Sequence, residues 1–172
     1  MEEKQSAKIG FGGGCHWCTE AVFQHVLGVQ GVEQGWIASV GSDAAFSEAV
    51  IVYFDPGIVP LAVLVEIHLR THQSTKRHSM RTKYRSAIYI FFDGQREEVM
   101  ALLKVLQSQF EEELITKVMP FQAFKGSGEE LRNYYLQNPH KPFCETYINP
   151  KLSMLIEKYA AFTASAKLAH LR

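Results

Sequence analysis

A chain of 172 residues, 47% of them hydrophobic and 21% charged, is long enough to bury one core and too apolar for general disorder. Eighteen basic residues balance eighteen acidic ones, so the formal charge is zero, which argues against a nucleic acid or an anionic membrane as partner. The polar start and the lack of an apolar run of ~20 residues, the length of a membrane helix, lead us to expect a cytoplasmic protein.

The apolar pattern alternates between two periodicities along the chain. Period-two stretches and β-formers predict strands at 7–11, 29–39, 46–54, 84–92 and 118–124. Helical spacing predicts helices at 15–27, 60–68, 95–113, 129–135 and 151–172. We interpret 72–83 as a polar loop and 140–150 as an irregular, mobile segment. Strands interleaved with helices indicate a single domain of the α/β or α+β class.

The most informative stretch is the triple glycine followed by Cys15-His16-Trp17-Cys18. It places Cys15 where a glycine-rich loop enters a helix, and the free N–H groups and dipole at a helix start stabilise an anion. A thiolate is such an anion, so the position favours a reactive Cys15 of lowered pKa. The alternative is a small, buried, unreactive cysteine at a turn.

Two other cysteine patterns compete with a single nucleophile. Cys15-x-x-Cys18 fits a thioredoxin-like redox pair, and less well half of a zinc site, because only one further cysteine exists and the histidines lack ligand spacing. Cys144, expected on a mobile segment, suits a resolving thiol that reaches an oxidised Cys15. Cys18, three positions along the helix, is interpreted as packed and unreactive.

Five ordered motifs resemble the type A methionine sulfoxide reductases. Gly14-Cys15-His16-Trp17-Cys18 is similar to that family's Gly-Cys-Phe-Trp-Cys motif. The other four are Glu48 in its strand before Asp55-Pro56, His72 with Ser74-Thr75, Lys83-Tyr84-Arg85-Ser86-Ala87-Ile88, and Asn133-Tyr134-Tyr135 with Asn138-Pro139.

The resemblance implies an α+β roll with a ferredoxin-like core, a mixed sheet and flanking helices. It divides the chain into a flexible tail (1–6), a catalytic domain (7–152) and a C-terminal helical extension (153–172). It implies an oxidoreductase that repairs proteins under oxidative stress by reducing methionine S-sulfoxide, free or in proteins. No metal or organic cofactor is expected, and thioredoxin is the expected reductant.

The resemblance also assigns roles to single residues. Cys15 would be the nucleophile, Glu48 the proton donor, Tyr84 a hydrogen-bond donor to the sulfoxide oxygen and Cys144 the resolving thiol. Burial of Glu48 on its strand would favour the neutral carboxyl that a proton donor needs. Trp17 would offer an apolar face to the substrate methyl group.

Three expected substrate-binding positions depart from the family pattern. His16 replaces a phenylalanine, Trp36 stands where a tyrosine is usual, and Ser79 replaces an aspartate. His16 introduces a titratable ring beside the nucleophile. These changes keep open a low-activity descendant that binds oxidised methionine, next to the thiol-disulfide oxidoreductase. The basic residues of the 72–83 loop, Lys76, Arg77, His78 and Arg81, are interpreted as a solvated surface rather than a docking site.

Overall fold

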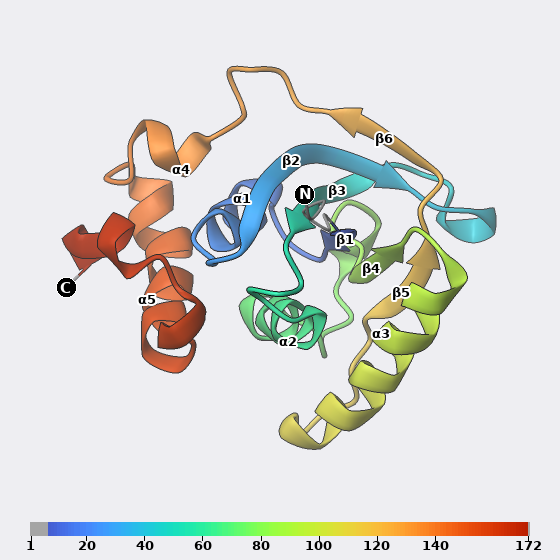
Figure 1. The fold of residues 1–172 in the computed structure, drawn as a ribbon. Helices are drawn as coiled ribbons and strands as arrows, with labels where there is room; N and C mark the ends of the chain where they lie inside the picture. The colour runs from blue at the N-terminus through green and yellow to red at the C-terminus, as the bar shows by residue number, and fades with distance from the viewer. Residues whose placement is uncertain (1–6, 172) are drawn as a thin grey trace, which may run out of the picture.

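One mixed sheet organises the molecule, seen in a computed structural model that describes residues 7–171 (Figure 1). Its strand order is β5-β4-β1-β3-β2-β6, and every neighbouring pair is antiparallel except β4 and β5. The strands are β1 (Ala7–Gly12), β2 (Val29–Ala38), β3 (Ser47–Phe54), β4 (Ala87–Ile90), β5 (Lys117–Pro120) and β6 (Ala123–Gly126). The helices are α1 (His16–Gln24), α2 (Leu61–Thr71), α3 (Asp93–Leu106), α4 (Tyr134–Gln137) and α5 (Asn149–Lys158).

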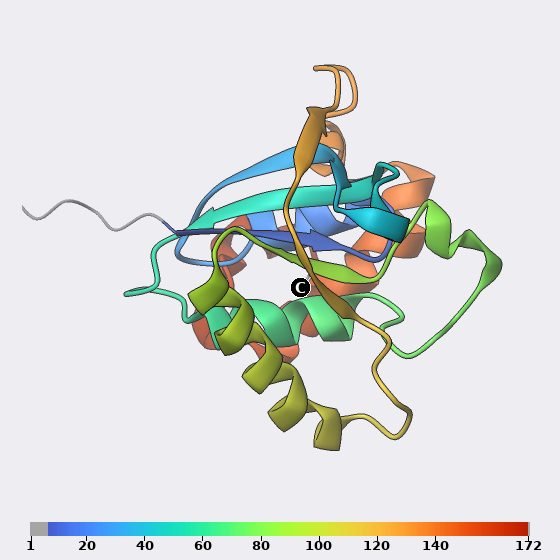
Figure 2. The same ribbon diagram turned by 90° about the vertical axis from the view of Figure 1, so that its right-hand side faces the viewer.

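The chain order β1-α1-β2-β3-α2-β4, with strands arranged 4-1-3-2, is the ferredoxin-like arrangement. The predicted single domain, with a mixed sheet and flanking helices, is confirmed. Figure 2 turns the molecule by 90° and shows α2 and α3 on the same side of the sheet. No helix among residues 7–171 is long and apolar enough to cross a membrane.

The two faces of the sheet differ in what covers them, and β3 shows the difference. Val50, Val52 and Phe54 belong to the large core that also contains the helices, whereas Ala49 and Ile51 belong to a smaller cluster on the other face. Side chains alternate along a strand, so Glu48 lies on the same face as Val50. The Glu48 carboxyl group is thereby directed toward the start of α1.

Four predicted segments are wrong. The single strand expected at 118–124 is two strands, β5 and β6, at opposite edges of the sheet, and the helix expected at 151–172 ends at Lys158. The helix expected at 129–135 begins only at Tyr134, after Asn133 with a left-handed φ of 56°. The Asn133 N–H donates to Glu20 Oε2 at 3.1 Å, which holds that turn against α1. The segment 140–150 is not irregular, because a π-helical stretch, Cys144–Ile148, runs directly into α5. Pro150 is the second residue of α5, the helix that directly follows the wide π-helical turn.

The expected boundary between catalytic domain and C-terminal extension falls inside α5. Leu152 and Leu155, on either side of it, are both fully buried in the main core. A separable extension at 153–172 therefore stays a prediction, and the expected tail 1–6 lies outside the described residues.

The loop Gly12–Gly14, between β1 and α1, lies against two stacked histidines of α2 and its C-terminus. The Nε2–H of His68 donates to the Gly12 carbonyl at 2.7 Å, and the ring of His72 stacks on that of His68 at 4.1 Å. Burial lowers the pKa of His68 to about 3, and burial together with His68 lowers the pKa of His72 well below its usual value. Both rings are therefore neutral at physiological pH.

We expect Gly13→Ala to destabilise the protein more than Gly14→Ala. Gly13 has a φ of +149°, and a Cβ there would lie 2.4 Å from the His72 ring, whereas a Cβ on Gly14 meets nothing within 4 Å. The first substitution should lower the free energy of unfolding by about 2 kcal/mol or more, and the second by less than about 1 kcal/mol. Urea denaturation of both variants measures the difference, and equal losses would contradict the packing described.

The neutral histidines predict a loss of stability in mild acid. The unfolded chain protonates His68 near pH 6.5, but the folded chain does so only near pH 3, so the unfolded state binds more protons between these values. The free energy of unfolding should fall by up to about 1.4 kcal/mol per pH unit for each such histidine as the pH drops below 6.5. His68→Gln, which keeps a donor for Gly12, should reduce this slope, whereas His78→Gln in the exposed loop should not.

Candidate active site

Cys15 occupies the N-cap position of α1, directly after the glycine loop, and is half-buried. The pKa of its thiol is lowered, chiefly by a hydrogen bond from the Cys18 thiol and further by the N–H groups of Trp17 and Cys18, although neither N–H forms a complete cap bond. Burial and the charge of Glu48 act in the opposite direction. The predicted setting of a reactive thiol at a helix start is thus present.

Cys18 lies beside Cys15 in the first turn of α1. It is buried, and its pKa is raised, first because its thiol proton is held by Cys15 and second because burial disfavours a thiolate. The lowered pKa of Cys15 and the raised pKa of Cys18 make Cys15 the sulfur that ionises more readily. Cys18 is packed as expected, and its lack of reactivity stays a prediction.

The side chains of Glu48 and His16 are in contact at the start of α1. Oε1 of Glu48 lies 3.2 Å from Nε2 of His16, while Nδ1–H of His16 donates to the Gly35 carbonyl at 2.9 Å. The backbone N–H of His16 also points to Oε1, at 3.5 Å, so one carboxyl oxygen faces two nitrogens of the same residue. Both side chains are buried, as expected for Glu48.

The second carboxyl oxygen of Glu48 is buried and has no hydrogen-bond partner among the described residues. The nearest charge is the exposed Lys83, whose Nζ lies 3.7 Å from Oε2. A buried, unpaired carboxyl oxygen is unfavourable unless a ligand completes its hydrogen bonding. Oε2 therefore has a free position for a polar atom of a substrate.

Aromatic side chains enclose the space between Cys15 and Glu48. A cavity of about 340 Å³ is lined by both residues together with His16, Trp17, Trp36, Lys83, Tyr84 and Phe143. Trp36 is paired with Glu48 across β2 and β3, and its ring meets His16 edge-on at 5.1 Å. The Trp17 ring is held in place by a parallel stack on Tyr134 at 4.0 Å. The arrangement fits a small apolar group that carries one polar atom.

A second cavity, of about 290 Å³, adjoins Cys15 and also contains Cys18, His72, Tyr84 and Lys151. Nζ of Lys151 donates to the Thr71 carbonyl, and burial lowers the pKa of this lysine. Its ammonium group is close enough to Cys15 and Cys18 for both thiols to favour its charged form. Lys151 thus supplies positive charge behind the thiol pair.

Cys144 lies in neither cavity. It is fully buried within the π-helical segment, its S–H donates to the Asn138 carbonyl at 3.6 Å, and burial raises its pKa. Its neighbour Phe143 lines both cavities, so the Cys144 segment borders the site without presenting the thiol. The expectation of an irregular segment is wrong, because Cys144 and Ile148 anchor it in the core.

Of the expected substrate-binding residues, His16, Trp17 and Trp36 line the first cavity and Ser79 does not. Ser79 is exposed at the start of a short helical turn, η2 (Ser79–Thr82), and lines neither cavity beside Cys15. Tyr84 lies after η2, before β4, and lines both cavities instead of sitting on a strand as expected.

Sequence reasoning missed three residues of the site: Lys83, Phe143 and Lys151. Lys83 directly precedes Tyr84, and Phe143 directly precedes Cys144. Their positions next to expected catalytic residues could therefore have indicated that they lie at the site. Lys151 had no such signal, because α5 brings it to Cys15 only through tertiary packing.

Removal of the Cys18 thiol should raise the pKa of Cys15. In a Cys144→Ser background, Cys18→Ala should raise it by about one unit, since a hydrogen bond to a thiolate is lost. Cys18→Ser, which retains a donor, should raise it less. The pH dependence of Cys15 alkylation by iodoacetamide measures this pKa, and an unchanged value in Cys18→Ala would refute the hydrogen bond.

The comparisons with known proteins point to one family. The sequence model described as "Peptide methionine sulfoxide reductase" matches residues 7–163. The chain is 31% identical to the "Peptide methionine sulfoxide reductase MsrA" of Ralstonia nicotianae over 93% of this chain and 95% of that protein. It is 32% identical to the MsrA of Deinococcus radiodurans over 87% of this chain and 80% of that one.

Solved structures agree in fold. Reduced Mxr1 from Saccharomyces cerevisiae superposes with a TM-score of 0.73 at 21% identity, covering 85% of this chain and 93% of that one. Mxr1 solved "in complex with Trx2" gives a TM-score of 0.59 at 21% identity, covering 75% and 85% of the two chains. The family match over 7–163 carries the conclusion: this chain belongs to the peptide methionine sulfoxide reductase family.

Proposed function

We propose that this protein reduces methionine S-sulfoxide, free or in proteins, to methionine and is recycled by thioredoxin. One observation carries the proposal: the activated Cys15 thiol and the Glu48 carboxyl group face each other across a single aromatic cavity. A sulfoxide needs both groups, because its sulfur accepts a nucleophile only when its oxygen is protonated or strongly hydrogen-bonded.

The substrate is held by complementary contacts. The methyl group of the sulfoxide packs against Trp17 and Trp36, and its oxygen takes the free position at Glu48 Oε2. Tyr84, on the same cavity wall, donates a second hydrogen bond to that oxygen. The fixed order of methyl group, oxygen and attacking thiol around the chiral sulfur selects one epimer.

The reaction exchanges an oxygen between two sulfurs. The Cys15 thiolate attacks the sulfoxide sulfur while the carboxyl proton of Glu48 passes to the oxygen. Methionine leaves with its sulfur reduced, and Cys15 is oxidised to a sulfenic acid that keeps the oxygen. His16, whose Nε2 lies 3.2 Å from Glu48 Oε1, passes a proton back to the carboxyl group after each turnover.

Recycling proceeds by two thiol exchanges. The Cys144 thiol attacks the sulfenic sulfur, a Cys15–Cys144 disulfide forms, and water leaves with the sulfenic oxygen. Two thiols of thioredoxin then reduce that disulfide and become a disulfide themselves. Cys144 is buried, so the 144–148 segment must loosen first; its wide π-helical turn is a less regular part of the helix.

The cytoplasm is the proposed location. All three cysteines are free, as suits a reducing compartment that supplies thioredoxin. The proposed chemistry needs only a sulfoxide substrate and a dithiol reductant.

The proposal is tested by turnover of each sulfoxide epimer with dithiothreitol. Wild type should form methionine from the S-epimer only, Cys15→Ser should form none, and Glu48→Gln should be slower by about 100-fold or more. Glu97→Gln, an exposed glutamate of α3, serves as the matched control and should turn over normally. The proposal would be overturned if Cys15→Ser still formed methionine or if wild type formed none. Wild type that binds the sulfoxide but forms no methionine would be a non-catalytic protein that binds oxidised methionine.

A single turnover without reductant adds a second readout to this test. Peptide mapping should find the Cys15–Cys144 disulfide. A Cys15–Cys18 disulfide alone would instead assign recycling, or a general thiol-disulfide exchange, to the adjacent pair.

A further inference from the structure

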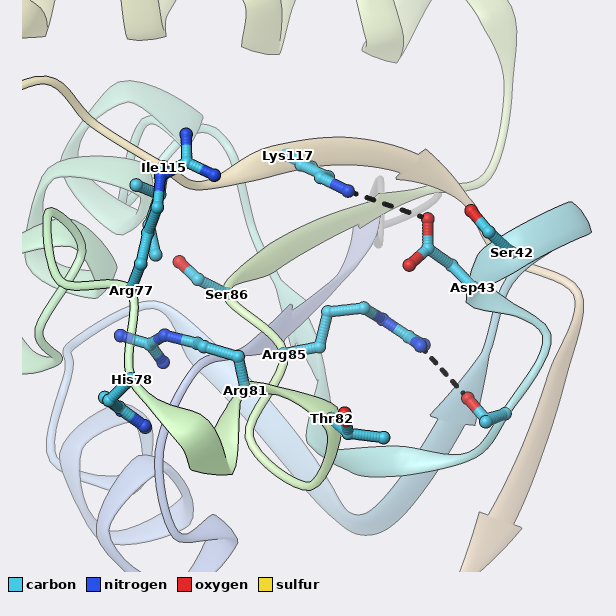
Figure 3. A pocket seen from close by; sticks show the side chains of 11 residues that line it. Ser42, Asp43, Arg77, His78, Arg81, Thr82, Arg85, Ser86, Ile115 and Lys117 are labelled. Carbon is cyan, nitrogen blue, oxygen red and sulfur yellow. Dashed lines mark hydrogen bonds and ion pairs between the residues drawn. The ribbon is translucent and has the colours of Figure 1, made fainter.

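A positively charged pocket shares no lining residue with the first cavity at Cys15 and shares only His78 with the second. It opens between the segment Gly41–Ala45, the loop 77–86 and the start of β5, and has a volume of about 380 Å³ (Figure 3). Four basic side chains line it, Arg77, Arg81, Arg85 and Lys117, with His78 at its edge. The sequence pattern had suggested only a solvated basic loop here.

Negative charge is scarce in this pocket. Among residues 7–171, Asp43 is the only acidic residue that lines it, and its carboxylate is 4.0 Å from Nζ of Lys117. Three guanidinium groups are left without a carboxylate partner in the lining. Figure 3 shows Lys117 and Arg85 both extending toward the Gly41–Ala45 segment, with Arg77 and Arg81 across the pocket from them.

Arg81 and Arg85 are held in place by backbone oxygens, which neutralise no charge. Arg81 donates to the carbonyls of Gly13 at 2.8 Å and Tyr84 at 2.9 Å through Nη1, and also to those of Lys76 and Gln73. With four of its five N–H groups so used, one remains.

Arg85 is fixed in the same way on the other side. It donates to the carbonyls of Ala45 at 3.1 Å and Ile37 at 3.2 Å and to the Tyr89 hydroxyl at 3.2 Å, which leaves two N–H groups. These arginines are therefore preorganised, so an incoming ligand need not immobilise them. Burial lowers the pKa of Arg81.

We propose that this pocket binds a phosphate group, as free phosphate or as a phosphomonoester. A tetrahedral dianion accepts hydrogen bonds from several directions, which suits donors arriving from two fixed guanidinium groups and from the freer Arg77 and Lys117. It also offsets two of the three unpaired charges, whereas a carboxylate offsets one and accepts hydrogen bonds in a single plane. Ile115 supplies an apolar wall beside which a group attached to the phosphate can lie.

The phosphate pocket is separate from the sulfoxide cavity, but one of its arginines contacts the glycine loop that precedes Cys15. Arg81 lines the phosphate pocket and at the same time holds the Gly13 carbonyl of the nucleophile loop. None of the residues that bind the sulfoxide in the proposed reaction lines the phosphate pocket. Binding can therefore be measured without turnover, and its failure would leave the proposed function untouched.

The test is calorimetric titration of the full-length protein with inorganic phosphate at neutral pH, with acetate and chloride at equal ionic strength as comparisons. Phosphate should bind saturably and raise the unfolding temperature, while acetate and chloride should not. Arg77→Gln/Lys117→Gln should raise the phosphate dissociation constant about tenfold. The matched control, Arg96→Gln/Lys104→Gln, removes the same charges from exposed positions of α3 and should change nothing.

A second titration with a short neutral peptide that carries phosphoserine distinguishes the two sources. Tighter binding of the peptide assigns the pocket to a phosphomonoester, and tighter binding of the free ion assigns it to phosphate itself. The proposal is overturned when wild type shows no saturable phosphate binding, when acetate binds equally, or when the α3 variant loses as much affinity as the pocket variant.

Discussion

The site depends on one constraint, the fixing of the three-glycine loop by donors to its carbonyl groups. His68 donates to the Gly12 carbonyl and Arg81 to that of Gly13. With these carbonyls held on one side, the chain turns so that Cys15 caps α1 and its sulfur approaches the N–H groups of the first turn. A neutral His68 is part of this arrangement, since a protonated ring would bury an unpaired charge in the core. Histidine burial and thiol reactivity are thus two consequences of one packed loop.

The register of β3 is the second determinant. Alternation along the strand puts Glu48 on the helix-covered face, and pairing with β2 sets Trp36 beside it. A buried carboxyl group is tolerated at this place because both the ring and the backbone N–H of His16 face Oε1. The Lys83 ammonium group lies on the side of Oε2. His16, which takes the place of a phenylalanine in the family pattern, therefore sets a ring nitrogen 3.2 Å from the carboxyl group.

Local signals predicted what depends on local structure. Triple glycine before a helical pattern located the Cys15 turn, and strand alternation located Glu48, because both follow from backbone geometry within a few residues. The burial of Cys144 was not predictable in this way: Pro142 and Pro150 suggested an irregular segment, but contacts of Ile148 and Leu152 with the core favour a helix there. Lys151 and the carbonyl partners of Arg81 come from segments far apart in sequence, which no local pattern reports. Ser79 was expected at the substrate site from its position before Tyr84 in the family pattern. The helical turn η2 instead leaves it exposed to solvent.

The three thiols face conflicting requirements, and the structure separates them. A thiol that lowers the pKa of Cys15 must stay protonated and close to it, which describes Cys18. A resolving thiol must stay away until the sulfenic acid exists, since a Cys15–thiol contact before substrate binds would invite premature disulfide formation. Burial of Cys144 in a helical segment meets that requirement, and the wide π turn lies where the segment must open. In the proposed reaction, proximity to the nucleophile is therefore a poor guide to the resolving role, because Cys18 is the nearer cysteine and Cys144 the one assigned to resolve the sulfenic acid.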